Sequence, residues 1–161
     1  MARRIFAIVT MGLCLLLFTA VAVATASSRS TTGTWKLNLA KSSYGKMPAP
    51  KFEQLVVTTD QPNAVAWKLT GASADGKTYI SMYNGPIDGN YHPMTSSETG
   101  DTVAYTRTSS GIKWVTKDKK GTVISQGINE LSADGKTLVI KGTAQGPSGW
   151  ESFVSVFERE Q

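Results

Sequence analysis

Residues 33–39 read Gly-Thr-Trp-Lys-Leu-Asn-Leu, so that Trp35, Leu37 and Leu39 alternate with polar residues. Alternation with a period of two is typical of a β-strand that buries one face. Residues 150–158, near the other end of the chain, form a second candidate strand rich in apolar and aromatic residues. Neither segment contains a Pro or an inward-facing Lys of the kind that protects an exposed sheet edge. We therefore expect these two strands to pair with each other, which closes the sheet into a barrel.

Strand candidates and turn signals alternate between these two ends, and no stretch after Gly33 has a convincing helical period. The hexamer Ser-Ala-Asp-Gly-Lys-Thr occurs twice, at residues 73–78 and 132–137. Asp-Gly between two alternating runs is a strong hairpin signal, because Gly accepts the positive φ of a tight turn. An internal duplication is the alternative explanation, but the flanking residues do not match. The sequence therefore predicts an all-β, antiparallel up-and-down meander that closes into a barrel of about 8–10 strands.

The first 26 residues have the three parts of a secretory signal peptide. Arg3 and Arg4 precede an almost wholly apolar run, which ends in the small-residue steps Ala22-Val23-Ala24 and Ala24-Thr25-Ala26. We expect cleavage after Ala26 and export to the periplasm or the cell exterior. The alternative is an uncleaved anchor, because the apolar run is long enough to cross a bilayer.

Three parts are expected along the chain: the signal peptide at 1–26, a flexible Ser/Thr-rich leader at 27–32, and a single barrel domain at 33–161. Cleavage removes Cys14, which is the one cysteine, so no disulfide or thiol chemistry remains. It also removes two of the 17 Lys and Arg residues and none of the 12 acids, which leaves a net charge of +3. The remaining cations are dispersed apart from one denser patch at Lys117, Lys119 and Lys120, so we expect no nucleic-acid partner. We also expect no membrane span after cleavage, and a monomer.

Gly33-Thr34-Trp35-Lys36-Leu37 resembles the Gly-x-Trp opening of the lipocalins and fatty-acid-binding proteins. Residues 155–160, Ser-Val-Phe-Glu-Arg-Glu, resemble the closing strand of the fatty-acid-binding proteins. In lipocalins the opening tryptophan closes the barrel floor and a basic residue near the chain's end packs across it. The resemblance implies those roles for Trp35 and Arg159, in a cation–π contact. The residues expected to close the barrel are Gly33, Trp35, Phe157 and Arg159.

A longer pattern combines Gly-Thr-Trp-Lys-Leu-Asn with Ala-Lys-Ser-x-Tyr, Pro-Ala-Pro-Lys, Asp-Gly-Asn-Tyr-His-Pro and Ala-Asp-Gly-Lys-Thr. It resembles a group of small secreted bacterial proteins described as lipocalin-like, which implies no particular activity. Fatty-acid-binding proteins hold the ligand carboxylate with an arginine and a tyrosine on the last strand. Ser155 and Phe157 occupy the matching positions here, so a fatty acid is not the expected ligand.

Aromatic residues on the candidate strands predict a small-molecule site inside the barrel. If they point inward, they form an apolar pocket with a few polar groups. The alternative is an ordinary filled core made by Val65, Trp67, Leu69, Ile80, Met82, Ile112 and Trp114. The expected ligand-binding residues are Trp67, Tyr79, Tyr83, Tyr105, Arg107 and Trp114.

No catalytic residue, metal site or cofactor is expected. His92, the one histidine, lies in a Gly/Pro-rich connection rather than beside a nucleophile. Most acids are expected in turns, where Asp75, Asp88 and Asp134 each precede Gly, and the acids considered on strands are Glu53, Glu130 and Glu151. The sequence therefore argues against an enzyme.

Two functions of different classes remain open. The first is an exported carrier or sensor of a small apolar molecule held in the barrel. The second is a surface-binding module for an envelope polymer or protein, with a filled core and with Trp150, Tyr44 and the 117–120 hairpin exposed. The volume of the barrel interior distinguishes the two, since a carrier needs several hundred Å3.

Overall fold

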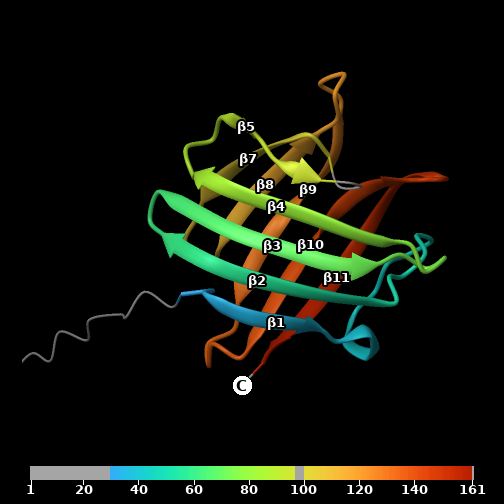
Figure 1. The fold of residues 1–161 in the computed structure, drawn as a ribbon, viewed down its shortest axis with the longest axis horizontal. Helices are drawn as coiled ribbons and strands as arrows, with labels where there is room; N and C mark the ends of the chain where they lie inside the picture. The colour runs from blue at the N-terminus through green and yellow to red at the C-terminus, as the bar shows by residue number, and fades with distance from the viewer. Residues whose placement is uncertain (1–29, 97–99, 161) are drawn as a thin grey trace, which may run out of the picture.

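The computed structural model describes residues 30–96 and 100–160 (Figure 1). The predicted signal peptide, its cleavage site and residues 27–29 of the predicted leader lie outside the described residues. None of the helical structure in the described ranges has the length and apolarity that crossing a bilayer requires.

Eleven strands and one 3-10 turn make up the described chain, and nine of the strands are longer than three residues. They are β1 (Gly33–Leu37), η1 (Leu39–Lys41), β2 (Phe52–Gln61), β3 (Ala64–Ala72), β4 (Thr78–Pro86), β5 (Tyr91–Pro93), β6 (Thr95–Ser96), β7 (Thr102–Arg107), β8 (Ile112–Lys117), β9 (Val123–Leu131), β10 (Thr137–Gly146) and β11 (Gly149–Arg159).

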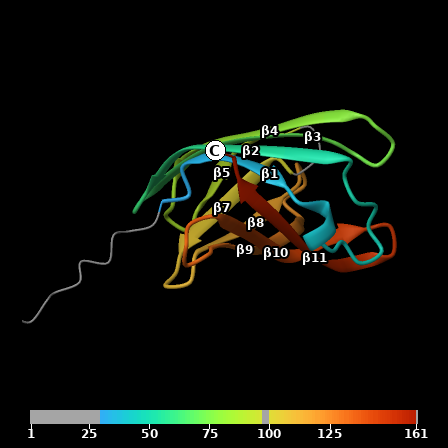
Figure 2. The ribbon, with the colours of Figure 1, turned by 90° about the horizontal axis from the view of Figure 1, so that it is seen from below.

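The strands form one antiparallel sheet in the order β5-β7-β8-β9-β10-β11-β1-β2-β3-β4-β6. In this order β1 pairs with β11, so that Trp35 lies opposite Arg159 and Leu37 lies opposite Phe157. Figure 2 shows β2, β3 and β4 in one layer and β7 to β11 in the other. The prediction of an antiparallel meander whose first and last strands pair is confirmed.

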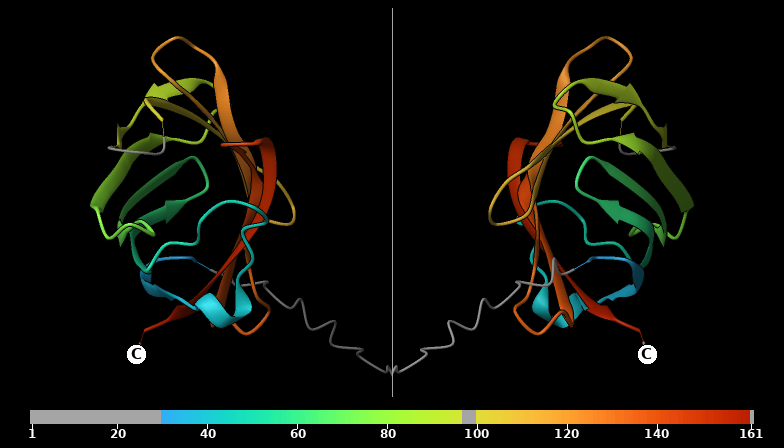
Figure 3. Two further views of the ribbon diagram at one scale, coloured as in Figure 1. Left: turned by 90° about the vertical axis from the view of Figure 1, so that its right-hand side faces the viewer. Right: turned by 90° about the vertical axis from the view of Figure 1, so that its left-hand side faces the viewer.

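A single short segment spans the remaining gap between β4 and β7. β5 and β6 flank Met94, and they pair with different neighbours: Tyr91 lies opposite Ala104 of β7, and Thr95 lies opposite Met82 of β4. The chain therefore crosses from one border of the sheet to the other within residues 91–96. Viewed from its two ends in Figure 3, the molecule is a nearly closed ring of strands.

Arg159 stabilises the junction between the first and last strands of the barrel. Its guanidinium carbon lies 4.1 Å from the centre of the Trp35 ring, a favourable cation–π geometry. The same guanidinium donates to the carbonyl oxygens of Thr32, of Ser30 at 3.1 Å and of Gly135 at 2.9 Å. Trp35 is fully buried and donates from Nε1 to the Thr31 carbonyl at 2.8 Å.

Residues 30–32 fall in the segment that the sequence predicted to be a flexible leader. Here they are attached to the barrel, because Arg159 binds two of their carbonyls and Thr31 bonds to Asp60 of β2. We call residues 30–32 the N-terminal strap. The strap adds long-range hydrogen bonds that strand patterning does not reveal.

Gly33 follows the strap in a backbone conformation that favours glycine, with φ of 132°. A Cβ atom at this position would lie 2.6 Å from Nη1 of Arg159, whose guanidinium is already held by three carbonyls. Both the backbone and the available space therefore require glycine here.

We expect Gly33→Ala to lower the free energy of unfolding by about 3 kcal/mol, from positive-φ strain together with displacement of the guanidinium. Gly149→Ala is the matched control, because Gly149 has φ of 109° and no atom within 4 Å of a Cβ atom there. It should cost about 1–2 kcal/mol from backbone strain alone. Urea denaturation of both variants measures the difference, and equal losses would show that Arg159 does not constrain this position.

The repeated hexamer forms the same two turn hydrogen bonds at both of its positions. In the first copy the Ser73 hydroxyl donates to Asp75 at 2.7 Å, and the Gly76 amide donates to the Ser73 carbonyl at 2.8 Å. The second copy repeats these bonds between the corresponding residues, with distances of 2.6 and 3.0 Å. Local turn chemistry therefore accounts for the repeat.

Candidate functional site

The barrel contains a partly open cavity of about 840 Å3. Seven strands contribute side chains to its wall, namely β2, β3 and β7 to β11, together with Thr31, Met94 and the 108–111 turn. Cavities that bind small molecules usually measure about 300–1,000 Å3. The interior is therefore hollow, contrary to the alternative in which the barrel's own side chains fill it.

Apolar side chains form the middle of the wall. One buried cluster surrounds Trp35 and Phe157, and a second surrounds Val103 and Tyr105. Trp67 packs against both clusters, so its indole lies where they meet. The apolar residues on the cavity wall include Leu55, Val57, Val65, Leu69, Val103, Ile112, Leu131, Leu138, Ile140, Phe153 and Phe157.

Four of the six predicted ligand-binding residues line this cavity: Trp67, Tyr105, Arg107 and Trp114. The Trp67 indole donates to the Tyr105 hydroxyl at 2.9 Å. Burial raises the pKa of Tyr105 far above its usual range, so this phenol stays neutral. The pair contributes two aromatic rings to the cavity wall, and the indole N–H is already hydrogen-bonded.

Tyr79 and Tyr83 are buried and face inward, but they do not form part of the cavity wall. Tyr83 packs against Tyr105 with ring centroids 5.1 Å apart, and its hydroxyl donates to the Pro86 carbonyl at 2.9 Å. Tyr79 donates to a carboxylate that does line the cavity, as described below. Both tyrosines therefore contact residues of the cavity wall without lining it themselves: Tyr83 packs against Tyr105, and Tyr79 donates to Glu53.

Ile80 and Met82, which the filled-core alternative placed inside, are exposed on the outer face of β4. The reason is the register with β3, where Trp67 lies opposite Tyr83 and Leu69 lies opposite Ser81. Residues directly opposite each other in an antiparallel pair share a face of the sheet. The inward tryptophan of β3 therefore turns the tyrosine face of β4 inward.

A β-bulge in β2 determines which of its polar residues reach the interior. Glu53, Leu55 and Val57 follow strict alternation and all line the cavity. Between Val57 and Thr59 the register with β3 shifts by one residue, which leaves Thr58 as the extra residue. Asp60 therefore faces inward, whereas uninterrupted alternation would turn it outward.

Asp60 anchors one end of the cavity. Its Oδ1 accepts from Nη2 of Arg107 at 2.7 Å, and its Oδ2 accepts from the backbone N–H and the hydroxyl of Thr31, both at 2.7 Å. Burial alone would raise the pKa of this carboxyl group. The hydrogen bonds from Thr31 and Arg107 outweigh the effect of burial and hold the pKa of Asp60 below its usual range. Asp60 therefore joins Arg107 and the N-terminal strap in one ionic network.

Glu53 lies at the other end of the cavity wall. The Tyr79 hydroxyl donates to its Oε1 at 2.5 Å. Burial raises the pKa of Glu53 in spite of this bond, because loss of water disfavours the charged form. Ser155 also lines the cavity and donates to the Tyr44 hydroxyl at 3.1 Å.

Sequence reasoning did not single out Asp60 or the strap, and it considered Glu53 only as a candidate catalytic acid. Alternation along β2 could have placed Glu53 on the face shared by Leu55 and Val57. No local signal in the sequence marks the bulge that turns Asp60 inward.

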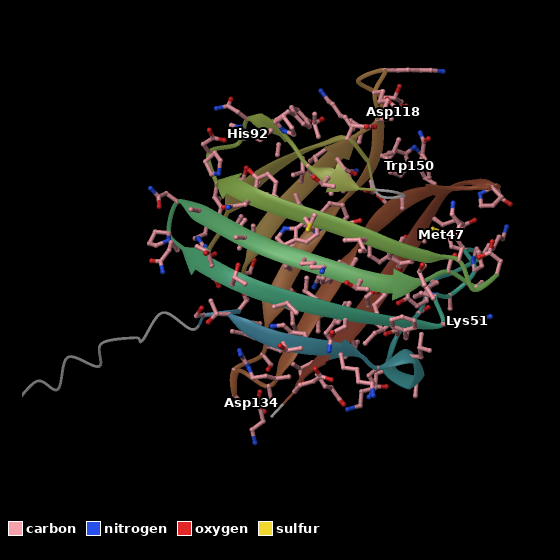
Figure 4. All side chains as sticks on the ribbon, in the orientation of Figure 1. Met47, Lys51, His92, Asp118, Asp134 and Trp150 are labelled. Atoms are coloured by element: carbon pink, nitrogen blue, oxygen red, sulfur yellow. The ribbon has the colours of Figure 1, made fainter. Side chains whose placement is uncertain are left out.

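The other residues considered for chemistry lie away from the cavity wall. His92 lies at the rim of the molecule, on β5, and contacts Asp88 at 3.0 Å (Figure 4). Glu130 pairs with Lys141 at 2.7 Å. In the described ranges no group of three or more His, Cys, Asp or Glu residues could hold a metal ion. Trp150 is exposed near the tip of the β10–β11 hairpin, whereas Tyr44, expected on the surface in the second hypothesis, is half-buried.

No protein-family model and no curated protein matches this sequence. Solved structures do match the fold. One is a redesigned β-barrel with 14% sequence identity, covering 83% of this chain and 96% of that chain, with a TM-score of 0.49. Another is the zebrafish ileal bile acid-binding protein complexed with cholic acid, with 11% identity, covering 81% of this chain and 100% of that chain, with a TM-score of 0.47. These similarities are limited to the fold of the barrel.

Proposed function

We propose that this protein is an exported carrier or sensor that binds a small apolar molecule inside its barrel. The observation that carries the proposal is the hollow interior of about 840 Å3, whose wall is largely apolar with polar groups toward its ends. That combination is the usual form of a small-molecule site, in which apolar contact supplies affinity and a few polar groups orient the ligand.

Export is the second part of the proposal and rests on the sequence. Arg3 and Arg4, the apolar run after them and the Ala-x-Ala steps that end it have the pattern of a secretory signal. An exported barrel with a hollow, apolar interior suits the transport or sensing of molecules that dissolve poorly in water.

Ala144→Phe tests whether the cavity binds ligand, because Ala144 lies on the cavity wall and a benzyl group there occupies part of the space. Wild-type protein should bind the uncharged probe N-phenyl-1-naphthylamine saturably, and Ala144→Phe should weaken binding at least about tenfold. Ala133→Phe is the matched control, since Ala133 is exposed in the β9–β10 turn and should leave the affinity unchanged.

Circular dichroism establishes that both variants are folded, and native mass spectrometry of protein purified from its host looks for a retained small molecule. The proposal would be wrong if the wild type showed neither saturable probe binding nor a co-purifying mass. It would also be wrong if both variants bound the probe as the wild type does, because the probe would then lie outside the barrel.

A further inference from the structure

The charges on the cavity wall are few and unequally available to a ligand. Among the described residues that line the cavity, the charged ones are Glu53, Asp60 and Arg107. The wall therefore carries one cation and two acids. The charge that the cavity prefers in a ligand depends on which of these three groups is already paired within the protein.

Arg107 is paired within the protein. Its Nη2 donates to Asp60 at 2.7 Å and to the Gln61 carbonyl at 2.6 Å, and its Nε donates to the Pro62 carbonyl at 3.2 Å. An anionic ligand at this end would have to compete with Asp60, whose carboxylate is 4% exposed and is held from its other side by Thr31. This end of the cavity therefore offers little attraction to a carboxylate.

Glu53 has no cationic partner in the described part of the chain. Its Oε1 accepts from Tyr79, and no described residue donates to its Oε2. The two side chains that interact with it are neutral phenols: Tyr79 on β4, and Tyr44, whose pKa rises mainly from burial and partly from the negative charge of Glu53. A desolvated carboxylate without a counter-ion gains more from a cation than a solvated carboxylate does.

The two ends are separated by an apolar stretch. Glu53 and Asp60 lie seven residues apart on β2, a separation of about 20 Å at the rise of a β-strand. Leu55 and Val57 line the wall between them, and Leu69 and Trp67 lie opposite these two residues on β3. An extended hydrocarbon chain fits along this wall with its head group at Glu53.

We infer that the cavity selects a cationic amphiphile, a molecule with an alkyl or aromatic body and a protonated amine that pairs with Glu53. This inference rests on the proposed function and adds the charge of the ligand to it. It predicts an order of affinity in which an amine binds more tightly than an alcohol, and an alcohol more tightly than a carboxylate of the same chain length.

The test is displacement of N-phenyl-1-naphthylamine by dodecylamine, dodecanol and dodecanoate, which share one chain and differ in head group. Wild-type protein should bind dodecylamine at least about tenfold more tightly than dodecanoate. Glu53→Gln keeps the shape of the side chain and an acceptor for Tyr79 but removes the charge. In this variant the preference for the amine should fall to within about twofold, while dodecanol binds as before.

Glu130→Gln is the matched control, because it removes a carboxylate that pairs with Lys141 away from the cavity wall. The wild-type preference should persist in this variant. The inference is overturned if dodecanoate displaces the probe as well as dodecylamine does, or if Glu53→Gln retains the amine preference. Either result would leave the proposed carrier intact, whereas failure of the probe and of all three compounds to bind would count against the carrier itself.

Discussion

Replacing Trp35 by alanine should lower the free energy of unfolding by about 3–5 kcal/mol, the range for truncating a large buried aromatic residue. The side chain is 0% exposed and packs with Leu37, Leu55 and Phe157. Its loss would open a cavity where the first and last strands meet. It would also remove the ring that lies 4.1 Å below the Arg159 guanidinium and the donor to the Thr31 carbonyl.

Trp150→Ala is the control, because it makes the same change at a site that is 48% exposed. It should cost about 0.5 kcal/mol or less. Chemical denaturation followed by far-ultraviolet circular dichroism compares the two, since that signal does not depend on tryptophan fluorescence. Similar losses in the two variants would mean that the pairing of β1 with β11 contributes little to stability.

Asp60→Ala should cost about 2 kcal/mol, because it removes charge-assisted hydrogen bonds from Arg107 and Thr31 at once. The cost stays below that of breaking a fully buried ion pair, since Arg107 is 36% exposed and water can replace part of what it loses. Glu130→Gln is the control, because it breaks an ion pair of the same 2.7 Å length whose carboxylate is 31% exposed. That change should cost less than about 1 kcal/mol.

The same network predicts how stability depends on pH. The pKa of Asp60 is lower in the folded protein than in the unfolded chain, where it is about 3.9. Its contribution is therefore fully present above that value and is lost as the pH falls through the lower, folded pKa. The stability difference between wild type and Asp60→Asn should be largest near neutral pH and should shrink in acid. A difference that does not change with pH would show that the ionised carboxylate is not what Thr31 and Arg107 recognise.

The pairing of the two ends of the chain could be predicted from residues 33–39 and 150–158. Both segments are apolar on one face and lack edge protection, and the structure places Trp35 opposite Arg159 and Leu37 opposite Phe157. The hairpins could also be predicted from the sequence, because Asp-Gly turns are encoded by adjacent residues. The pairing of the two short strands β5 and β6 could not be predicted in this way, since their partners lie on opposite borders of the sheet.

The candidate site could be predicted only in part. Alternation placed Tyr105 and Arg107 on one face of β7, and both line the cavity. On β4 alternation defines two faces, one with Tyr79 and Tyr83 and one with Ile80 and Met82, but it does not say which face is inside. The register with β3 makes that choice.

The long strands and the hairpins follow from alternation and turn chemistry, which can be recognised along the chain. The pairing of the first and last strands follows from the apolar faces and the missing edge protection of these two segments. The hollow interior, the inward turn of Asp60 at the Thr58 bulge and the unpaired charge of Glu53 depend on how distant strands share one volume. Such properties arise from register and packing between segments far apart in sequence, so no local pattern contains them.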